Sequence, residues 1–346
     1  GTTYSLYSLG VIFEDTKAEV LYKNLTQTAG TDLSDGTWTN TANNQATTAS
    51  TTAWYELFVF YRKTGLIYSA RGTSATAGTH ICTYDPAGSA AFSDTHQALT
   101  FTNIGQGIVH SKDDILYIPY YNNAGGAGAK SFIAKNNNGS WTTQALILPD
   151  AFIPVSICEY GNYLAIGCRP ASELGASRVF LWDRDSTLAT LAESVDWGEG
   201  NLKVLEEVEG HLVGISNMGI GATGASNQLK GELVIRTYNG GTASVLKRFI
   251  STGNNVNLQI AKQKVNQFLY FLCSNLALNG TGHVGLWKIG RVTPDAPFAL
   301  TFDRTASNDD SMADVGLKGF FIAGDYAFVA YTDTGDVYKL TKTSES

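Results

Sequence analysis

Residues 155–166, with the sequence Val-Ser-Ile-Cys-Glu-Tyr-Gly-Asn-Tyr-Leu-Ala-Ile, contain the pattern that decides the fold. Two short apolar runs flank the turn residues Gly161 and Asn162. Short runs of β-branched and aromatic residues bounded by Gly, Asn or Asp predict β-strands joined by tight turns. Sustained helical periodicity is absent, although residues 186–194 and 201–208 could each form a turn or two of helix. The sequence therefore predicts an all-β protein.

The unit of a turn residue followed by an apolar strand occurs seven times along the chain. The turn residues are Gly10, Gly65, Asp114, Asn162, Gly210, Gln267 and Asp325. Successive turn residues are 55, 49, 48, 48, 57 and 58 positions apart. Self-similarity at a period of roughly 20–50 residues is the signature of an architecture built from repeated supersecondary units.

Three further types of strand accompany the turn strand at matching offsets. A second strand follows it at 80–85, 131–135, 178–183, 232–236, 284–288 and 336–340. A third type precedes the turn at 56–61, 107–111, 155–160, 203–208 and 317–323. A fourth closes the unit at 98–102, 142–148, 245–250 and 298–302. Four antiparallel strands repeated about every 50 residues predict the blades of a β-propeller, with a β-sandwich as the weaker alternative.

The repeat predicts that residues 1–346 form a single propeller domain. Seven turn strands favour seven blades. Six blades with an N-terminal extension are the alternative, because the first unit has only residues 1–9 before its turn and the last has no fourth strand. If residues 2–7 complete the C-terminal blade, strands from the two ends of the chain close the ring.

The composition restricts the partners that this chain can have. It has 24 Lys and Arg against 31 Asp and Glu, a net charge of −7, and no basic cluster. Because phosphate binding needs a basic surface, nucleic acid is excluded as a main partner. The apolar runs are strand-sized, well short of the roughly 20 residues that a membrane-spanning helix needs, so we expect no membrane insertion.

The side chains that could perform catalysis are scattered. The five histidines show no metal-binding spacing, and His110, which precedes Asp113 and Asp114, is the strongest candidate among them. We interpret adjacent carboxylates as turn chemistry, since Asp side chains bond their own backbone in turns. These pairs are Asp113/Asp114, Asp183/Asp185, Glu206/Glu207, Asp309/Asp310 and Asp333/Asp336. We expect no catalytic centre, no metal site and no cofactor.

Three tryptophans, Trp38, Trp141 and Trp197, are the candidate binding residues, because an indole face near a blade edge can stack on a ligand such as a sugar ring. The alternative is that they pack between blades. The four cysteines lie in apolar runs without CxxC spacing, which favours buried free thiols.

Two stretches resemble known propeller families. Residues 35–38, Asp-Gly-Thr-Trp, and 138–141, Asn-Gly-Ser-Trp, resemble the blade turn of fungal fucose-binding lectins and a shortened sialidase Asp box. In those families the motif shapes the turn between the last two strands of a blade. The loops rich in Gly, Ala, Ser, Thr and Asn, with the apolar stretch 319–331 and residues 338–340, resemble propellers of bacteriophage tail and other virion proteins.

These observations predict a non-enzymatic structural or binding propeller on a virion or extracellular surface, as a decoration, tail or attachment protein. We expect it to belong to a multi-copy assembly and to contact other structural proteins or a host-surface glycan or protein. The connections 26–52, 121–130 and 217–230 would provide specificity, because loops on a rigid scaffold usually do. A carbohydrate-binding lectin is the first alternative. A glycan-processing hydrolase or lyase, with paired carboxylates at one channel mouth, is the second.

Overall fold

Within the described ranges the chain forms β-strands joined by turns and irregular connections, with no helix. The structure is a computed structural model that describes residues 5–14, 17–28, 37–40, 45–46, 52–74, 77–85, 92–123, 128–172, 175–185, 193–219, 231–250, 257–278, 281–293, 295–305, 317–323, 326–331 and 337–341. No helix able to span a membrane is found in these ranges. The predicted all-β class is confirmed.

The helical turn considered for residues 201–208 is wrong. This segment is strand β18, Asn201–Val208, in which buried Leu202 and Val204 flank half-buried Lys203. Its buried side chains belong to the clusters on both sides of the sheet, Leu202 and Leu205 to one and Val204 and Val208 to the other. The other segment considered for a helical turn is 186–194. Its residues 193–194 begin strand β17, and residues 186–192 lie outside the described ranges.

The strands belong to two compact units, which we describe separately. The first unit comprises residues 1–102 and 316–346. Its first sheet contains β1 (Ser5–Glu14), β2 (Lys17–Thr28), β3 (Thr37–Asn40) and β4 (Gln45–Ala46). Its second contains β5 (Thr52–Tyr61), β6 (Leu66–Ser74), β7 (Ala77–Tyr84) and β8 (Phe92–Phe101). Its third contains β26 (Leu317–Ala323), β27 (Tyr326–Tyr331) and β28 (Val337–Thr341).

The second unit, residues 103–315, contains four sheets. One has β9 (Asn103–Ile104), β10 (Ile108–Val109), β11 (Leu116–Tyr121), β12 (Ser131–Asn137) and β13 (Ser140–Leu148). The next has β14 (Phe152–Tyr160), β15 (Tyr163–Pro170), β16 (Ala176–Trp182) and β17 (Glu193–Glu199). The third has β18, β19 (His211–Gly219), β20 (Gly231–Tyr238) and β21 (Ser244–Ile250). The last has β22 (Asn257–Val265), β23 (Phe268–Leu278), β24 (Thr281–Gly290) and β25 (Ala299–Thr305).

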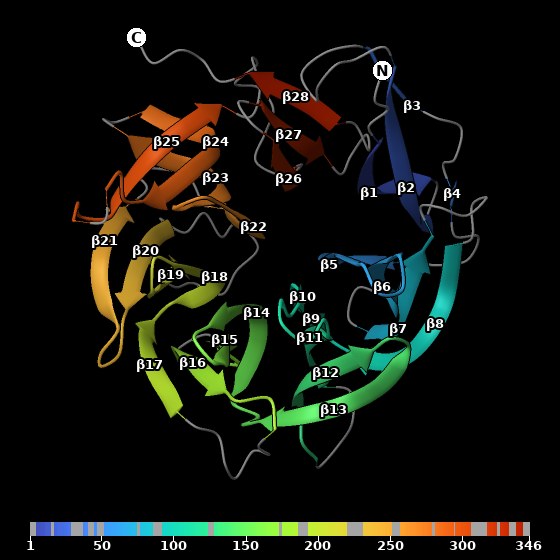
Figure 1. Ribbon diagram of the computed structural model, residues 1–346, viewed down its shortest axis with the longest axis horizontal. Coiled ribbons are helices and arrows are strands. Elements are labelled where there is room, and N and C mark those ends of the chain that lie inside the picture. The colour runs from blue at the N-terminus through green and yellow to red at the C-terminus, as the bar shows by residue number, and fades with distance from the viewer. Residues whose placement is uncertain are drawn as a thin grey trace. The chain divides into compact units, whose positions relative to one another are not determined.

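The strands of five sheets pair antiparallel in chain order, as the repeat predicts, and the other two sheets depart from it only in that β4 pairs with β2 and β9 with β11 (Figure 1). Consecutive sheets of the second unit contact each other through their first strands, β14 with β18 and β18 with β22. The apolar core of this unit lies between neighbouring sheets. One cluster joins Val204 and Ile215 of one sheet to Phe271 and Trp287 of the next, all essentially inaccessible to solvent. Burial between sheets explains why the strands are apolar on both faces.

The turn before the second strand explains the recurrent turn residues. Five residues at this turn have φ between +53° and +80°, in the left-handed region: Gly65, Asp114, Gly161, Gly210 and Asn266. Glycine, asparagine and aspartate tolerate that conformation best. Three predicted turn residues hold this place, and two predictions, at 162 and 267, are one residue too late.

The first predicted turn, at Gly10, is wrong. Gly10 lies inside β1 and pairs with Leu21 of β2. The second strand of this sheet begins at Lys17, which is 49 residues before Leu66, the start of the equivalent strand β6. In the sequence, a glycine inside a strand followed by apolar residues looks the same as a turn glycine followed by a strand, and this is why Gly10 was interpreted as a turn.

The two ends of the chain do not share a sheet in the described pairings. Ser5–Tyr7 pair with Asn24–Thr26 of β2, while residues 2–4 lie outside the described residues, so closure of the ring by the two ends stays a prediction. The described strands form seven sheets. That these sheets make up one domain remains a prediction.

The Asn-Gly-Ser-Trp motif at 138–141 forms the predicted turn between the last two strands of its sheet. It connects β12 to β13, with Asn138 at φ +52° and Gly139 at φ +89°. The Gly139 N–H donates to Oδ1 of buried Asn136 at 2.7 Å. The related motif at 35–38 differs, because Thr37 begins β3, which pairs with β2. That motif therefore precedes the third strand of its sheet.

Candidate functional site

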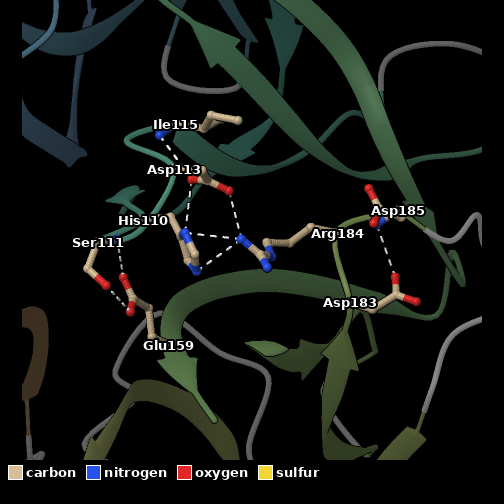
Figure 2. Close-up of polar contacts among 8 residues, drawn as sticks. All are labelled: His110, Ser111, Asp113, Ile115, Glu159, Asp183, Arg184 and Asp185. Atoms are coloured by element: carbon tan, nitrogen blue, oxygen red, sulfur yellow. Dashed lines mark hydrogen bonds and ion pairs between the residues drawn. The ribbon is translucent and has the colours of Figure 1, made fainter. Parts of the chain in front are cut away.

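A cluster of polar side chains lies where two neighbouring sheets of the second unit meet (Figure 2). His110, Ser111 and Asp113 come from the connection between β10 and β11. Glu159 is near the end of β14, and Arg184 follows β16 in the same sheet. Each sheet therefore supplies side chains to the other, and this cluster is the strongest candidate site in the described part of the chain.

His110 is held by its own connection. Its ring Nδ1 lies 2.9 Å from Oδ1 of Asp113, an oxygen that also accepts the Ile115 N–H at 3.2 Å. The backbone N–H of His110 donates to the carbonyl of Ile115, and the Asp114 N–H donates to the carbonyl of His110. These bonds fix the ring, which is only 4% exposed. Because a carboxylate only accepts hydrogen bonds, Nδ1 carries the proton that faces Asp113.

Arg184 closes the cluster from the adjacent sheet. Its Nη1 lies 2.7 Å from Oδ2 of Asp113, and 3.1 Å and 3.2 Å from the two ring nitrogens of His110. In an Asp–His pair that acts as a general base, the second ring nitrogen must face the reacting proton. Here Nη1 of the guanidinium lies 3.2 Å from that nitrogen, about as close as it lies to Nδ1. The geometry supports a contact between sheets and opposes use of His110 as a base.

Glu159 is engaged in a second contact between the same sheets. Its carboxylate accepts the Ser111 backbone N–H and, at 2.6 Å, the Ser111 hydroxyl. Behind the cluster, burial raises the pKa of Tyr117 to about 12, and the charge of Asp113 adds to the rise while Arg184 opposes it. Tyr117 packs edge-on against Trp182 at 5.7 Å, which places it in the core.

The pairing of arginine with histidine occurs again two sheets further along the chain. Nη2 of Arg291 lies 3.3 Å from Nε2 of His211, and the guanidinium carbon lies 4.2 Å from the centre of the Phe298 ring. Arg184 and Arg291 hold the same place in their sheets. Each lies two residues after the residue of the third strand, Trp182 or Ile289, that pairs with the second residue of the second strand. The arginines thus recur at equivalent positions, whereas His110 precedes its turn residue Asp114 and His211 follows its turn residue Gly210.

The first strands β14, β18 and β22 are joined by a further set of charged side chains. The Lys262 ammonium donates to the carbonyls of Ile157, at 2.9 Å, and Leu205, and it pairs with Glu206 at 2.9 Å. Lys262 is 8% exposed and Glu206 17%. Lys264, two residues along the same strand, pairs with Glu207 at 2.5 Å.

The described carboxylates considered for glycan processing form separate contacts, and Asp309, Asp310, Asp333 and Asp336 lie outside the described residues. Asp113 pairs with Arg184 in one place, and Glu207 pairs with Lys264 on other sheets. Asp183 accepts the Asp185 N–H at 3.0 Å, the predicted turn chemistry. Within the described ranges, no group of three or more His, Cys, Asp or Glu side chains is placed to hold a metal ion.

The three candidate tryptophans have different surroundings. Trp197 on β17 is fully buried in a core cluster, where an added Cβ on Gly214 of β19 would lie 2.5 Å from its ring. This supports packing between blades and leaves its indole face no access to ligand. Trp141 on β13 is half-buried and keeps its place as a candidate. Trp38 lies in β3, and its side chain is outside the described residues.

The four cysteines match the prediction from sequence. Cys82, Cys158, Cys168 and Cys273 are free and buried. Burial raises the pKa of the thiols of Cys158, Cys168 and Cys273 far above the ordinary value. Since the thiolate is the reactive form, these three side chains act as small apolar core residues.

Two important residues, Arg184 and Lys262, were not singled out from the sequence. Aligning the repeats on their turns does not find Arg184, because it lies 22 residues after Asn162 whereas Arg291 lies 24 residues after Gln267, and only the strand pairing makes the two equivalent. Lys262 gave no signal in the sequence either. A lysine on a first strand is ordinarily exposed, and only the packing of three strands shows that its ammonium is buried.

Comparison with solved structures identifies the fold. The chain superimposes on the WD40 propeller domain of Doa1 with a TM-score of 0.52 and 9% identity, covering 99% of this chain and 96% of that one. It superimposes equally on a Bacteroides uniformis protein described as a 6-phosphogluconolactonase, with a TM-score of 0.52, 12% identity and coverage of 99% and 93%. The fold is a β-propeller. At these identities the likeness shows the fold of the propeller and nothing more.

Neither a known protein family nor a curated protein matches the sequence of this propeller. The four-stranded antiparallel blades predicted from the repeat are confirmed.

Glu207 gives the propeller a predictable response to acid. Partial burial alone raises the pKa of Glu207, but hydrogen bonds from Lys264 and the Gly210 N–H outweigh it, so the pKa lies below its ordinary value. A carboxyl whose folded pKa is lowered contributes stability above its unfolded pKa, near 4.5, and loses it as the pH falls through the folded value. We expect Glu207→Gln to lower the free energy of unfolding at pH 7 and to have little effect at pH 3. Urea unfolding at both pH values measures this, and an equal effect at both would contradict it.

Proposed function

We propose that this chain is a non-enzymatic binding scaffold, a seven-bladed β-propeller displayed on a virion or another extracellular surface. One observation supports it most strongly: the side chains best suited to catalysis are engaged in contacts between sheets. His110 meets Arg184, Glu159 holds Ser111, and Glu207 pairs with Lys264. Such contacts fix the blades, so that the connections between strands can serve as the binding surface.

The composition and the sheets support the same proposal. Only 16% of the residues are charged, and the seven sheets in the described ranges match the seven units of the repeat. The partners we propose are other structural proteins of a multi-copy assembly, or a glycan or protein on a host surface. The stretches that would contact them are the connections 26–52, 121–130 and 217–230, and residues 220–230 of the last lie outside the described residues.

The location is tested by fractionating the source of the protein. We expect density-gradient centrifugation followed by mass spectrometry to find peptides of this chain in the particle fraction, at a copy number comparable with other structural proteins. Peptides confined to the soluble intracellular fraction would contradict display on a particle or cell surface.

The type of partner is tested with a glycan array and the purified chain. If the protein is a scaffold for protein contacts, no glycan binds at millimolar concentration. A glycan that binds wild type, and fails to bind Trp141→Ala of unchanged stability, would favour the lectin alternative instead.

A further inference from the structure

Two Asn-Gly dipeptides of the second unit lie in exposed connections, and their surroundings differ. They are Asn138-Gly139, between β12 and β13, and Asn239-Gly240, between β20 and β21. A third, Asn279-Gly280, lies outside the described residues. An asparagine followed by glycine is the most open to attack by the next backbone nitrogen, because glycine has no side chain to shield that nitrogen.

The turn at Asn138 holds the backbone nitrogen that would attack. Asn137 pairs with Ser140, so Asn138 and Gly139 are the two central residues of the turn. Their φ angles, +52° and +89°, are both positive, as a type I′ turn requires. The Gly139 N–H donates to Oδ1 of fully buried Asn136 at 2.7 Å. This hydrogen bond must break before Gly139 can lose its amide proton, as in amide hydrogen exchange.

The connection at Asn239 is longer and contains consecutive glycines. The ladder between β20 and β21 ends before residues 238–243. Gly240 and Gly241 have φ of +94° and +130°, and a Cβ added to either would meet no atom within 4 Å. Because glycine is conformationally permissive, this open stretch lets the side-chain carbonyl carbon of Asn239 approach the Gly240 nitrogen.

We propose that Asn239 is a site of spontaneous deamidation. The hydrogen bond from Gly139 to Asn136 protects Asn138 from the same reaction. The Gly240 nitrogen, after losing its proton to hydroxide, attacks Cγ of Asn239. A C–N bond forms, the bond from Cγ to the side-chain nitrogen breaks, and ammonia leaves with a proton taken from water, which regenerates hydroxide. Water then opens the five-membered succinimide at either carbonyl and gives aspartate or isoaspartate.

The modification changes the charge of the connection and, for isoaspartate, the length of its backbone. Either product adds a negative charge to a chain whose net charge is −7. Isoaspartate also routes the main chain through the former side-chain carbonyl, which inserts one carbon atom between β20 and β21. The altered connection leads into β21, the last strand of its sheet. The proposal is independent of the partner that the propeller binds.

The test follows both asparagines in one sample of the purified full chain. The protein is incubated at mildly alkaline pH, and tryptic peptides are analysed by mass spectrometry for the exchange of the amide NH2 for OH. Trypsin cuts after Lys135 and Arg236, so the two asparagines lie on different peptides. In the folded protein we expect Asn239 to react at least about fivefold faster than Asn138, a factor of the size that one hydrogen bond provides.

The urea-unfolded chain is the control for the effect of sequence alone. Unfolding breaks the Gly139 hydrogen bond and frees both connections, so the two rates should agree within about a factor of two. In the folded protein, hydrogen exchange should be slower at the Gly139 amide than at the Gly240 amide, because only a broken hydrogen bond permits exchange.

Two variants separate the roles of the residues. Asn136→Ala removes the acceptor of the Gly139 N–H and should raise the rate at Asn138 toward that at Asn239, which should not change. Asn239→Gln should abolish the modification of its peptide, because the longer side chain would have to form a six-membered ring. If Asn136→Ala does not fold, the comparison of folded with unfolded wild type decides.

Three results would overturn the proposal. The first is an intact Asn239 in the folded protein over a period in which the unfolded chain is modified there. The second is a ratio of the two rates that is the same in the folded and unfolded chains, which would assign the difference to neighbouring residues. The third is a rate at Asn138 that a folded Asn136→Ala leaves unchanged. None of these outcomes alters the glycan-array and fractionation results that test the scaffold function.

Discussion

Replacing Lys262 with methionine is expected to lower the free energy of unfolding by about 3 kcal/mol, because the change leaves a largely buried carboxylate without its cation. Lys262 is 8% exposed, and its ammonium contacts Glu206 and two main-chain carbonyls, those of Ile157 and Leu205. Methionine has a similar volume, so the loss reports polar contacts more than packing. Urea unfolding followed by circular dichroism measures it.

Lys264→Met is the matched control for this substitution. Lys264 lies on the same strand and also pairs with a glutamate, but it is 40% exposed, and exposed ion pairs contribute less than about 1 kcal/mol. The double variant Lys262→Met/Glu206→Leu should recover part of the stability, since it removes the unpaired charge and still leaves the two carbonyls without their donor. Equal losses for Lys262→Met and Lys264→Met would contradict the buried contact.

Trp197→Ala is expected to be at least as damaging, with a loss of about 3–5 kcal/mol. The indole is fully buried between β17 and β19, and the backbone of Gly214 lies directly against it. Trp141→Ala is the control, because Trp141 is half-buried on the strand β13. We expect it to cost less than half as much. Equal losses in thermal unfolding would show that Trp197 does not hold two sheets together.

The contact with Gly214 can be isolated by a double-mutant cycle. Gly214→Ala should destabilise wild type, since the new methyl group would lie 2.5 Å from an indole atom that cannot move away. In the Trp197→Ala background the same change should be nearly neutral. Additive effects would place the cost of Gly214→Ala elsewhere in the strand.

The fold was predictable because the same short pattern, a turn residue followed by an apolar strand, recurs along the chain. Turn residues such as Gly65, Asp114 and Gly210 need positive φ, and that need restricts the residue type at each turn. The prediction was wrong at Gly10, where a glycine inside β1 precedes an apolar run. A glycine before an apolar run can mark a turn or can lie inside a strand, and only the pairing of β1 with β2 shows which of the two applies at Gly10.

The site was less predictable, because its contacts join residues far apart in sequence. His110 and Asp113 are neighbours in one turn, and their proximity could be expected. Arg184 reaches them from the next sheet, and its role depends on how consecutive sheets pack. For Trp197 the sequence left two interpretations open, ligand stacking and packing between blades, and burial supports the second.

Turnover by wild type and by two carboxylate variants tests the central claim most directly. Asp113→Asn and Glu207→Gln remove the charges that a glycan-processing site would need, and each also breaks a contact between sheets. The account predicts that wild type releases no reducing sugar from a panel of polysaccharides, and that both variants only lose stability. Release of sugar by wild type, abolished in either variant at unchanged stability, would contradict a scaffold without catalysis.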